Sequence, residues 1–419
     1  MKEYNLYTVP SLRRVRLAAL VGLITVMLVV WAFLASYGRA LAAPAGAPSA
    51  QEPVVPDAGG ASDIRVFLPT VFQRQPMYSR LGYGALSDLP YPSVSDLQAG
   101  WYVNWKVNPA PNRPNGIEYA QTIRIHQRTV CQLPDRVQCP YVVPYAYDFA
   151  PDADTIRLAA RTNPGSMWFI GNEMERRDWG PEPHQKQDEM LPELYAVAYH
   201  ELYNLIKSED PKAQVAIGGV IQPTPLRLQY LTRVWNTYLD RYGQPMPVDI
   251  WNVHNFIIRE VRDEWGADIP AGIDAAVGEY ANDATTHINM GIFDQQIRAF
   301  RQWMKDRGQQ EKPLVINEYG VLLPNTVFKY PEEDSAVVQD FMLSTFDYFL
   351  NTKDCSLGYA ADECRLVQRW AWYSLDDDRT GFNRHAYLLD PDTDQLTPAG
   401  LAFRNFGQAN SVELSRILP

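Results

Sequence analysis

Several well-known signatures of catalysis are missing from this chain of 419 residues. It has no G-x-S-x-G nucleophile elbow and no H-E-x-x-H motif, which argues against a serine hydrolase and a metalloprotease. No G-x-G-x-x-G or Walker loop follows the first predicted strand, so nucleotide binding lacks its usual phosphate cradle. No fixed-period repeat is visible, which argues against a solenoid or a propeller.

Basic residues are in the minority. The chain has 38 Lys and Arg against 49 Asp and Glu, a net charge of -11. Because neutralising phosphates requires a basic face, this balance argues against a nucleic-acid partner. Hydrophobic residues make up 46% of the chain, which is enough for a large core and excludes a disordered protein.

The N-terminus has the pattern of an export signal. Three arginines between positions 13 and 16 precede an uncharged apolar run over 17–37, and an Ala-Leu-Ala triplet follows at 40–42. We therefore predict a secreted or cell-surface protein whose residues 1–42 are a signal peptide. The run is long enough to span a bilayer, so an uncleaved membrane anchor is the alternative, and membrane contact is expected through this segment alone.

The rest of the chain divides by composition. Residues 43–76 are rich in Ala, Pro and Gly and contain a short apolar stretch, which predicts a linker with a short strand. Residues 77–410 are expected to form the catalytic domain, and 411–419 a C-terminal tail. We expect a monomer.

Only four cysteines are present, in two local pairs. Cys131 and Cys139 are eight residues apart, and Cys355 and Cys364 are nine apart, each pair in a polar, turn-rich segment. In an exported chain this pattern favours two disulfides. Zinc is the alternative, but neither pair has the C-x2-C spacing and no histidine clusters with them.

From about residue 99, short apolar runs alternate with segments of helical period. The clearest helical stripes cover 191–206, 228–238 with Gly243 after it, and 337–349. The runs predicted as strands are 100–105, 120–126, 141–147, 167–173, 214–221, 248–256, 313–319 and 367–374. Eight buried strands alternating with helices predict a (β/α)8 TIM barrel, with a doubly wound sheet as the alternative.

Two glutamates end apolar runs abruptly. Asn172-Glu173 ends the fourth predicted strand and Asn317-Glu318 ends the seventh. In a barrel, chemistry lies at the carboxyl ends of the strands. Cleavage of a glycosidic bond with retention uses two carboxyl groups about 5 to 5.5 Å apart, which would explain both positions. The simpler alternative is that each is a solvated loop residue or an ion-pair partner, with Arg176 or Arg177 as the cation.

This pattern resembles the glycoside hydrolases of the large retaining (β/α)8 clan, clan A, whose acid/base follows an Asn at the end of strand four and whose nucleophile ends strand seven. The resemblance covers residues 99–406 and identifies no individual family. It implies that Glu173 is the acid/base and Glu318 the nucleophile. It also implies that Asn172 binds the sugar 2-hydroxyl and that Trp372 is the platform under the sugar.

Weaker matches extend the resemblance. Arg124 ends the second predicted strand, where the clan often has an Arg that keeps the nucleophile ionised. His254 ends the sixth, where the clan often has His or Tyr; a core histidine is the alternative. The segment 101–105 is similar to the first strand of a subset that cleaves β-1,3-glucans, although the fourth strand departs from that subset. The mechanism requires a low pKa for Glu318 and a raised one for Glu173.

Aromatic residues near the strand ends suit a sugar site, because pyranose rings present apolar faces that stack on flat side chains. Trp105, Trp179 and Tyr319 are the further candidates for substrate contact, with packing as the alternative for each. The sequence thus predicts an exported glycosidase that hydrolyses O-glycosyl bonds of a β-linked polysaccharide or oligosaccharide, without organic cofactor or catalytic metal. The competing interpretation is a non-catalytic surface barrel that binds glycan or has a structural role.

Overall fold

The computed structural model describes residues 79–131, 139–177, 187–280, 283–377 and 381–415. The predicted signal peptide, the predicted linker with its short strand, and Trp179 lie outside the described residues. Among the described residues, no helix has both the length and the apolar character needed to cross a membrane.

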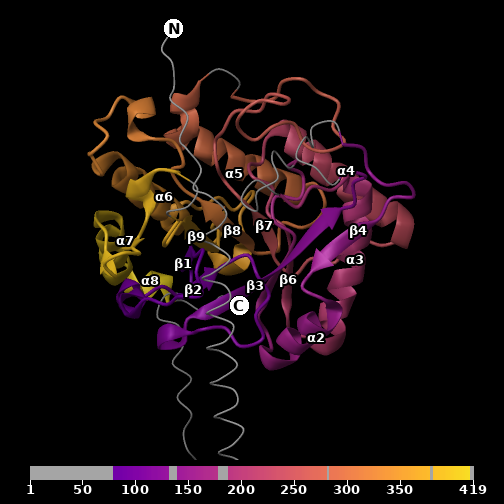
Figure 1. The fold of residues 1–419 in the computed structure, drawn as a ribbon, viewed down its shortest axis with the longest axis horizontal. Helices are drawn as coiled ribbons and strands as arrows, with labels where there is room; N and C mark the ends of the chain where they lie inside the picture. The colour runs from indigo at the N-terminus through magenta and orange to yellow at the C-terminus, as the bar shows by residue number, and fades with distance from the viewer. Residues whose placement is uncertain (1–78, 132–138, 178–186, 281–282, 378–380, 416–419) are drawn as a thin grey trace, which may run out of the picture. The chain divides into compact units, whose positions relative to one another are not determined.

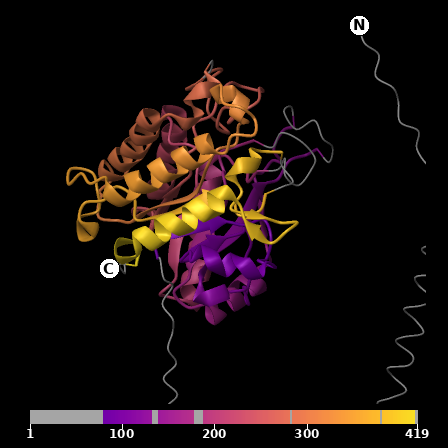
Figure 2. The same ribbon diagram turned by 90° about the vertical axis from the view of Figure 1, so that its left-hand side faces the viewer.

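Strands and helices alternate along the described residues, and the helices surround the strands (Figure 1). The strands are β1 (Leu81–Gly84), β2 (Trp101–Val103), β3 (Glu118–Gln127), β4 (Tyr147–Ala150), β5 (Met167–Ile170), β6 (Gln214–Ile217), β7 (Trp251–Val253), β8 (Leu314–Tyr319), β9 (Arg369–Tyr373), β10 (Leu389–Asp390) and β11 (Gln395–Leu396). The α-helices are α2 (Ala153–Thr162), α3 (Pro192–Glu209), α4 (Pro225–Tyr242), α5 (Met290–Lys305), α6 (Ala336–Asn351), α7 (Pro398–Ala409) and α8 (Ser411–Leu414). Figure 2 shows α6 and α7 side by side on the outer surface.

The parallel strands form a barrel. Hydrogen-bonded neighbours follow the order β6-β5-β3-β2-β1-β9-β8-β7, so the first and last parallel strands, β1 and β9, are joined. Between β6 and β7 the backbone N–H of Asp249 donates to Val215 O (3.0 Å), and that of His254 donates to Val220 O (2.9 Å). A ring of eight parallel strands confirms the (β/α)8 fold and excludes the doubly wound sheet, which stays open.

The first parallel strand, β1, was not among the predicted ones. It has four residues and two glycines, so it shows no apolar run. Both glycines make room for tryptophans: a Cβ on Gly82 would lie 2.5 Å from Trp101 Cε2, and one on Gly84 would lie 2.8 Å from Trp105 Cη2. Close packing against the neighbouring strand and its loop therefore excluded the apolar side chains that identify a strand.

The predicted third strand, 141–147, is wrong. Strand β4 begins only at its last residue, Tyr147, and pairs antiparallel with β3. It is the returning arm of a hairpin and lies outside the ring of parallel strands. Pro140 and Pro144 lack the N–H groups that a central strand donates to its neighbours. This error and the missed β1 cancel, so Glu173 still follows the fourth parallel strand, whereas the runs at 100–105 and 120–126 belong to the second and third.

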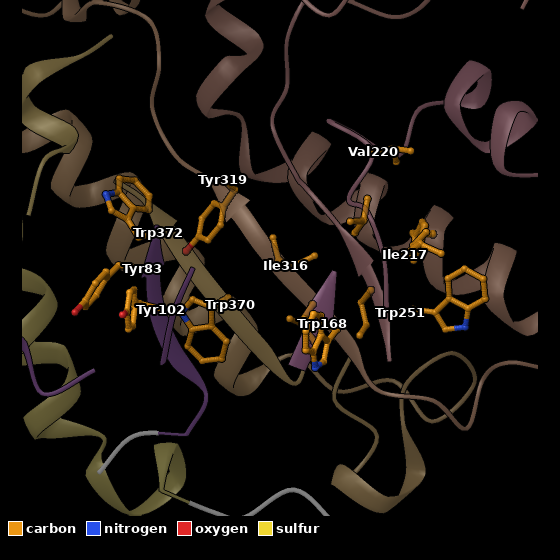
Figure 3. Close-up of a cluster of buried hydrophobic side chains, with 14 of the residues drawn as sticks. Tyr83, Tyr102, Trp168, Ile217, Val220, Trp251, Ile316, Tyr319, Trp370 and Trp372 are labelled. Carbon is orange, nitrogen blue, oxygen red and sulfur yellow. The ribbon is translucent and has the colours of Figure 1, made fainter. Parts of the chain in front are cut away.

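The predicted helices at 191–206, 228–238 and 337–349 are confirmed as α3, α4 and α6. Gly243 ends α4 in the left-handed conformation (φ 67°), as its position predicts. Side chains alternate along the strands: Met167 and Phe169 of β5 lie in the inner cluster. Trp168 (Figure 3) and Ile170 belong to the outer cluster, which includes the helices.

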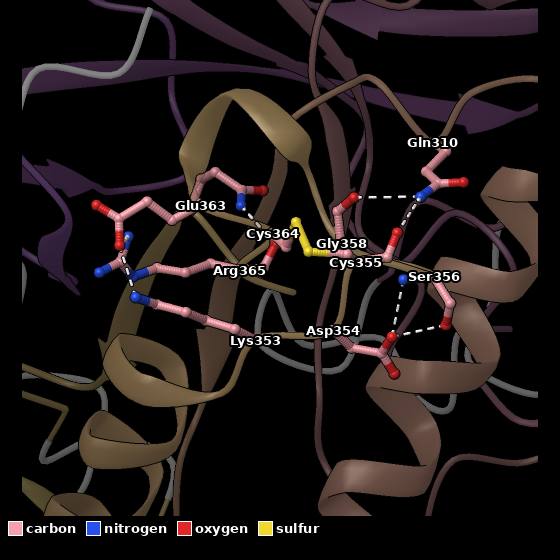
Figure 4. The surroundings of a disulfide bond; sticks show 10 residues. Gln310, Lys353, Asp354, Cys355, Ser356, Gly358, Glu363, Cys364 and Arg365 are labelled. Carbon is pink, nitrogen blue, oxygen red and sulfur yellow. Dashed lines mark hydrogen bonds and ion pairs between the residues drawn. A yellow bond between two sulfur atoms is a disulfide. The ribbon is translucent and has the colours of Figure 1, made fainter.

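Both predicted disulfides are confirmed, which leaves no free cysteine for zinc among the described residues. Cys131–Cys139 closes the β3–β4 hairpin near its tip. Cys355–Cys364 closes the loop between α6 and β9, where the backbone N–H of Asp354 also donates to Cys364 O (2.9 Å; Figure 4).

Replacing Cys355 and Cys364 together by Ser is expected to lower the free energy of unfolding by about 2 to 3 kcal/mol, because the open loop regains entropy in the unfolded chain. Urea unfolding of the oxidised wild type and the double variant measures this loss. Reduced wild type is the control and is expected to lose at least as much, since both disulfides open. An unchanged urea midpoint in the double variant would show that the loop is held by its hydrogen bonds alone.

The first residues of the predicted C-terminal tail form α8 and pack on the start of the barrel. Leu414 is fully buried, and its carbonyl accepts from the backbone N–H of Arg80 (3.4 Å) just before β1. The Arg80 side chain pairs with Asp362. The domain boundaries themselves stay predictions.

Candidate active site

The chain turns sharply after β5, and this turn places Glu173. Gly171 has φ 89°, and a Cβ there would lie 3.0 Å from Ile125 Cδ1, so glycine suits both the conformation and the space. Glu173 itself has φ 49°, which is unusual for a side chain of its size. Its N–H donates to Gly219 O (2.9 Å), and its side chain is buried.

Glu318 lies within β8, where the pairing with β9 changes register between Ile316 and Tyr319. Such an irregularity re-aims a side chain. One carboxylate oxygen of Glu318 accepts the indole N–H of Trp105 (2.9 Å), and the side chain is 12% exposed. The sequence prediction that Trp105 lies near the strand ends is correct, although what it contacts here is the second glutamate.

His254 joins the two glutamates. It follows β7 and is fully buried, with Nδ1 3.1 Å from Glu173 Oε1 and Nε2 3.7 Å from Glu318 Oε2. A Cβ on Gly219 would lie 2.3 Å from His254 Cδ2, so a glycine there lets the ring enter the site. One ligand atom of each residue, a carboxylate oxygen or a ring nitrogen, lies within 4.8 Å of those of the other two. The two carboxylates therefore approach each other closely at the imidazole of His254.

The same three residues are spaced so that they could hold a metal ion. However, each carboxylate already accepts from a protein donor: Glu173 from Arg176 and Glu318 from Trp105. A cation at this point would compete with the guanidinium of Arg176.

The charges around the two glutamates set their pKa values apart. Burial opposes ionisation of Glu173, but the charge of Arg176, 2.7 Å away, and the hydrogen bond with His254 outweigh it and lower its pKa to about 2. Burial and the charge of Glu173 raise the pKa of Glu318 to about 7, although His254 opposes the rise. Burial lowers the pKa of His254, but Glu318 and Glu173 raise it overall.

This order is the reverse of the sequence expectation, which had Glu173 raised and Glu318 low. The reason is the placement of the two arginines. Arg176 pairs with Glu173, as the simpler alternative for that residue anticipated. Arg124, expected beside Glu318, is bound to Asp188 through Nε (2.7 Å) and Nη2 (2.6 Å).

Arg124 therefore supports the end of β5 instead of bonding to Glu318. Its partner Asp188 also accepts the backbone N–H groups of Asn172 (2.8 Å) and Ile125 (3.1 Å). Asn172 is buried next to Glu173, and its contact with the substrate stays a prediction. Arg124 remains close enough to both glutamates for their charges to favour its own.

Trp372, expected as the platform under the sugar, and Tyr319, expected to contact substrate, do not reach the site. Both side chains are fully buried between the strands and the helices, with ring centroids 5.4 Å apart (Figure 3). The indole N–H of Trp372 donates to Ala386 O (2.8 Å), and the Tyr319 hydroxyl pairs with Thr345 (3.1 Å). Because successive side chains of a strand alternate, their neighbours Tyr373 and Glu318 face the site instead.

Tyr373 is the aromatic residue that the sequence analysis missed. Its ring lies 5.7 Å from that of Trp105, and its hydroxyl donates to Asp377 (2.6 Å). The charges of Glu318 and Glu173 both act on it. The run Arg369-Trp370-Ala371-Trp372-Tyr373 has an aromatic side chain on each face of the strand, so composition could not show which one lines the mouth.

No protein-family model and no curated protein match this chain. Among solved structures it is similar to a GH128 (subgroup VII) oligosaccharide-binding protein from Trichoderma gamsii, with 13% identity, a TM-score of 0.41, and coverage of 79% of this chain and 95% of that chain. It is also similar to a GH128 (subgroup VI) exo-beta-1,3-glucanase from Aureobasidium namibiae, with 10% identity, a TM-score of 0.42, and coverage of 78% and 96%. A third is GH5_18 from Streptomyces cattleya in complex with GlcNAc, with 12% identity, a TM-score of 0.43, and coverage of 80% of both chains. Similarity at this level says nothing of activity, and the barrel rests on its own strand pairing.

Proposed function

We propose that this protein is an exported glycosidase that hydrolyses a β-linked glycan with retention. The observation that carries the proposal is the meeting of Glu173 and Glu318 at one buried imidazole, from the ends of the fourth and seventh parallel strands. Burying two carboxylates at one point costs free energy, and such costly clusters of titratable groups are concentrated at functional sites. Retaining glycoside cleavage needs such a pair.

In the proposed first step, Glu173 gives a proton to the departing oxygen while Glu318 attacks the anomeric carbon. This step requires that the proton shared by the pair lie on Glu173 when substrate is bound, the reverse of the order in the free protein. In the second step, Glu173 takes a proton from water and the bond to Glu318 breaks. Tyr373 and Trp105 supply flat apolar surface near the carboxylates, and Asn172 is positioned beside Glu173 for a sugar hydroxyl. Trp179, outside the described residues, stays a candidate for substrate contact.

The direct test is release of new reducing ends from a panel of β-glucans, mannans, xylans and galactans by the full-length protein. Proton NMR of the first anomer released then distinguishes retention from inversion. Glycan binding without cleavage across the panel would instead favour a non-catalytic surface protein.

Replacing Glu173 by Gln is expected to reduce hydrolysis of natural glycans by about 10²- to 10⁴-fold, because the amide cannot donate the proton that the leaving oxygen needs. The first step on an aryl glycoside with a very good leaving group should be spared, since such a group departs without a proton. Pre-steady-state release of the aryl group measures that step. Equal losses in this step on both substrates would remove the acid role from Glu173.

A further inference from the structure

Arg176 is held at both ends of its guanidinium. Nη1 lies 2.7 Å from Glu173 Oε2, and Nη2 donates to Gly266 O (2.9 Å) on the loop after β7. The side chain is 15% exposed, so it is packed into the site rather than extended into solvent. A planar guanidinium bonded to a carboxylate on one side and a carbonyl on the other is fixed in direction as well as in distance.

The loop whose carbonyl accepts from Arg176 is held in place by close packing and by a hydrogen bond from a buried arginine. Gly266 has φ 127°, and a Cβ there would lie 2.4 Å from Arg259 O, so the loop is closely packed at this residue. The next carbonyl, of Ala267, accepts from Nη2 of the fully buried Arg227 (2.6 Å). The contact between Arg176 and Glu173 is therefore built into the fold and is not a chance surface ion pair.

This contact favours one of the two forms that Glu173 must adopt. A guanidinium can only donate, so it stabilises the carboxylate and opposes the protonated acid. The first proposed step needs the acid, and the second needs the carboxylate. We propose, on the basis of the proposed function, that Arg176 is a positioning residue for the second step. It keeps Glu173 in the form that accepts a proton from water. The ion pair between Arg176 and Glu173 opens while Glu173 acts as an acid.

The second step balances without a further reactant. The water oxygen bonds to the anomeric carbon as the bond from that carbon to Glu318 breaks, and the electron pair returns to the Glu318 carboxylate. The proton of the water passes to Glu173, next to Arg176. Loss of Arg176 therefore extends the protonated form of Glu173 to higher pH, so the pH range in which each half-reaction proceeds moves upward.

Several charged or titratable groups face Glu173, and Arg176 acts on it most strongly among the cations. The groups are Arg176 and Glu175 from its own loop, Arg124 from β3, His254 after β7, Glu318 from β8 and Tyr373 from β9. Arg124 is bound to Asp188, and His254 is shared between both glutamates. Without Arg176, burial dominates and the pKa of Glu173 rises.

The test is an infrared titration of carboxyl groups in the full-length protein, with Glu173→Gln used to assign the Glu173 band. Arg176→Met is expected to raise the pKa of Glu173 by about 2 pH units, and Arg176→Lys to restore most of the difference. Arg177→Met is the matched control, because Arg177 pairs with Asp263 and Asp268 and not with Glu173. A Glu173 titration unmoved in Arg176→Met would overturn the proposal.

Kinetics supply the second arm. On a 2,4-dinitrophenyl β-glycoside of the sugar identified by the panel, where the second step limits turnover, kcat requires the Glu173 carboxylate. Arg176→Met is therefore expected to move the acidic limb of the kcat–pH profile upward by about 2 pH units, and Arg177→Met to leave it in place. An acidic limb that does not move in Arg176→Met would overturn the proposal. Failure of this proposal can be told apart from failure of the proposed function. An inactive wild type would refute the glycosidase function, whereas an unchanged pKa of Glu173 in an active Arg176→Met enzyme would refute only the role of Arg176.

Discussion

Glu318→Gln is expected to lower kcat by about 10⁴-fold or more, a loss of at least about 5 kcal/mol of transition-state stabilisation. The amide has nearly the same shape, and its oxygen can still accept the indole N–H of Trp105. It carries no negative charge and is a poor nucleophile, so the covalent intermediate cannot form. Because the shape is kept, the loss reports on chemistry and not on folding.

Initial rates of reducing-end release from the best glycan of the panel measure this loss. Glu193→Gln is a matched control: Glu193 pairs with Arg233 on the outside of the barrel and is 46% exposed. It should retain wild-type rates, since an exposed ion pair contributes little. Wild-type turnover in Glu318→Gln would refute the proposed mechanism.

The second large effect concerns stability and comes from a buried charge network beside the site. Arg227 of α4 bonds to Glu175 Oε1 through Nε (2.9 Å) and also to Glu260, and none of the three side chains is exposed. Arg227→Met is expected to lower the free energy of unfolding by about 3 to 5 kcal/mol, because it leaves two carboxylates buried without their cation. Equilibrium urea unfolding measures the change.

The loss in Arg227→Met is expected to depend on pH. Burial already raises the pKa of Glu175 with Arg227 present, and removing the cation raises it further. A carboxyl group whose pKa is higher in the folded than in the unfolded protein destabilises the fold above that pKa, and the penalty fades as it takes up a proton. The loss should therefore be smaller at pH 5 than at pH 8.

Two further variants sharpen this test. Arg233→Met, on the same helix, removes an arginine that is 38% exposed and should cost no more than about 1 kcal/mol. Adding Glu175→Gln to Arg227→Met should recover part of the stability, since one uncompensated charge is gone. A loss as small for Arg227→Met as for Arg233→Met would show that the network does not hold the fold together.

Local patterns in the sequence determined much of this protein. The helical stripes of α3, α4 and α6 and the two disulfides follow from spacing along the chain, which tertiary packing did not override. The two Asn-Glu pairs could be found because a buried strand is continuously apolar and its end is marked by the first charged residue. His254 was found for the same reason.

Only the tertiary structure decided which side chains share the site and how they are charged. A shift of one residue along a strand exchanges its two faces, so Tyr373 rather than Trp372 lines the mouth. The glycines of β1 make sense only beside Trp101 and Trp105, which approach from the next strand and the loop that follows it. The pKa order of the two glutamates depends on distances between chain segments far apart in sequence, and no local sequence pattern contains those distances.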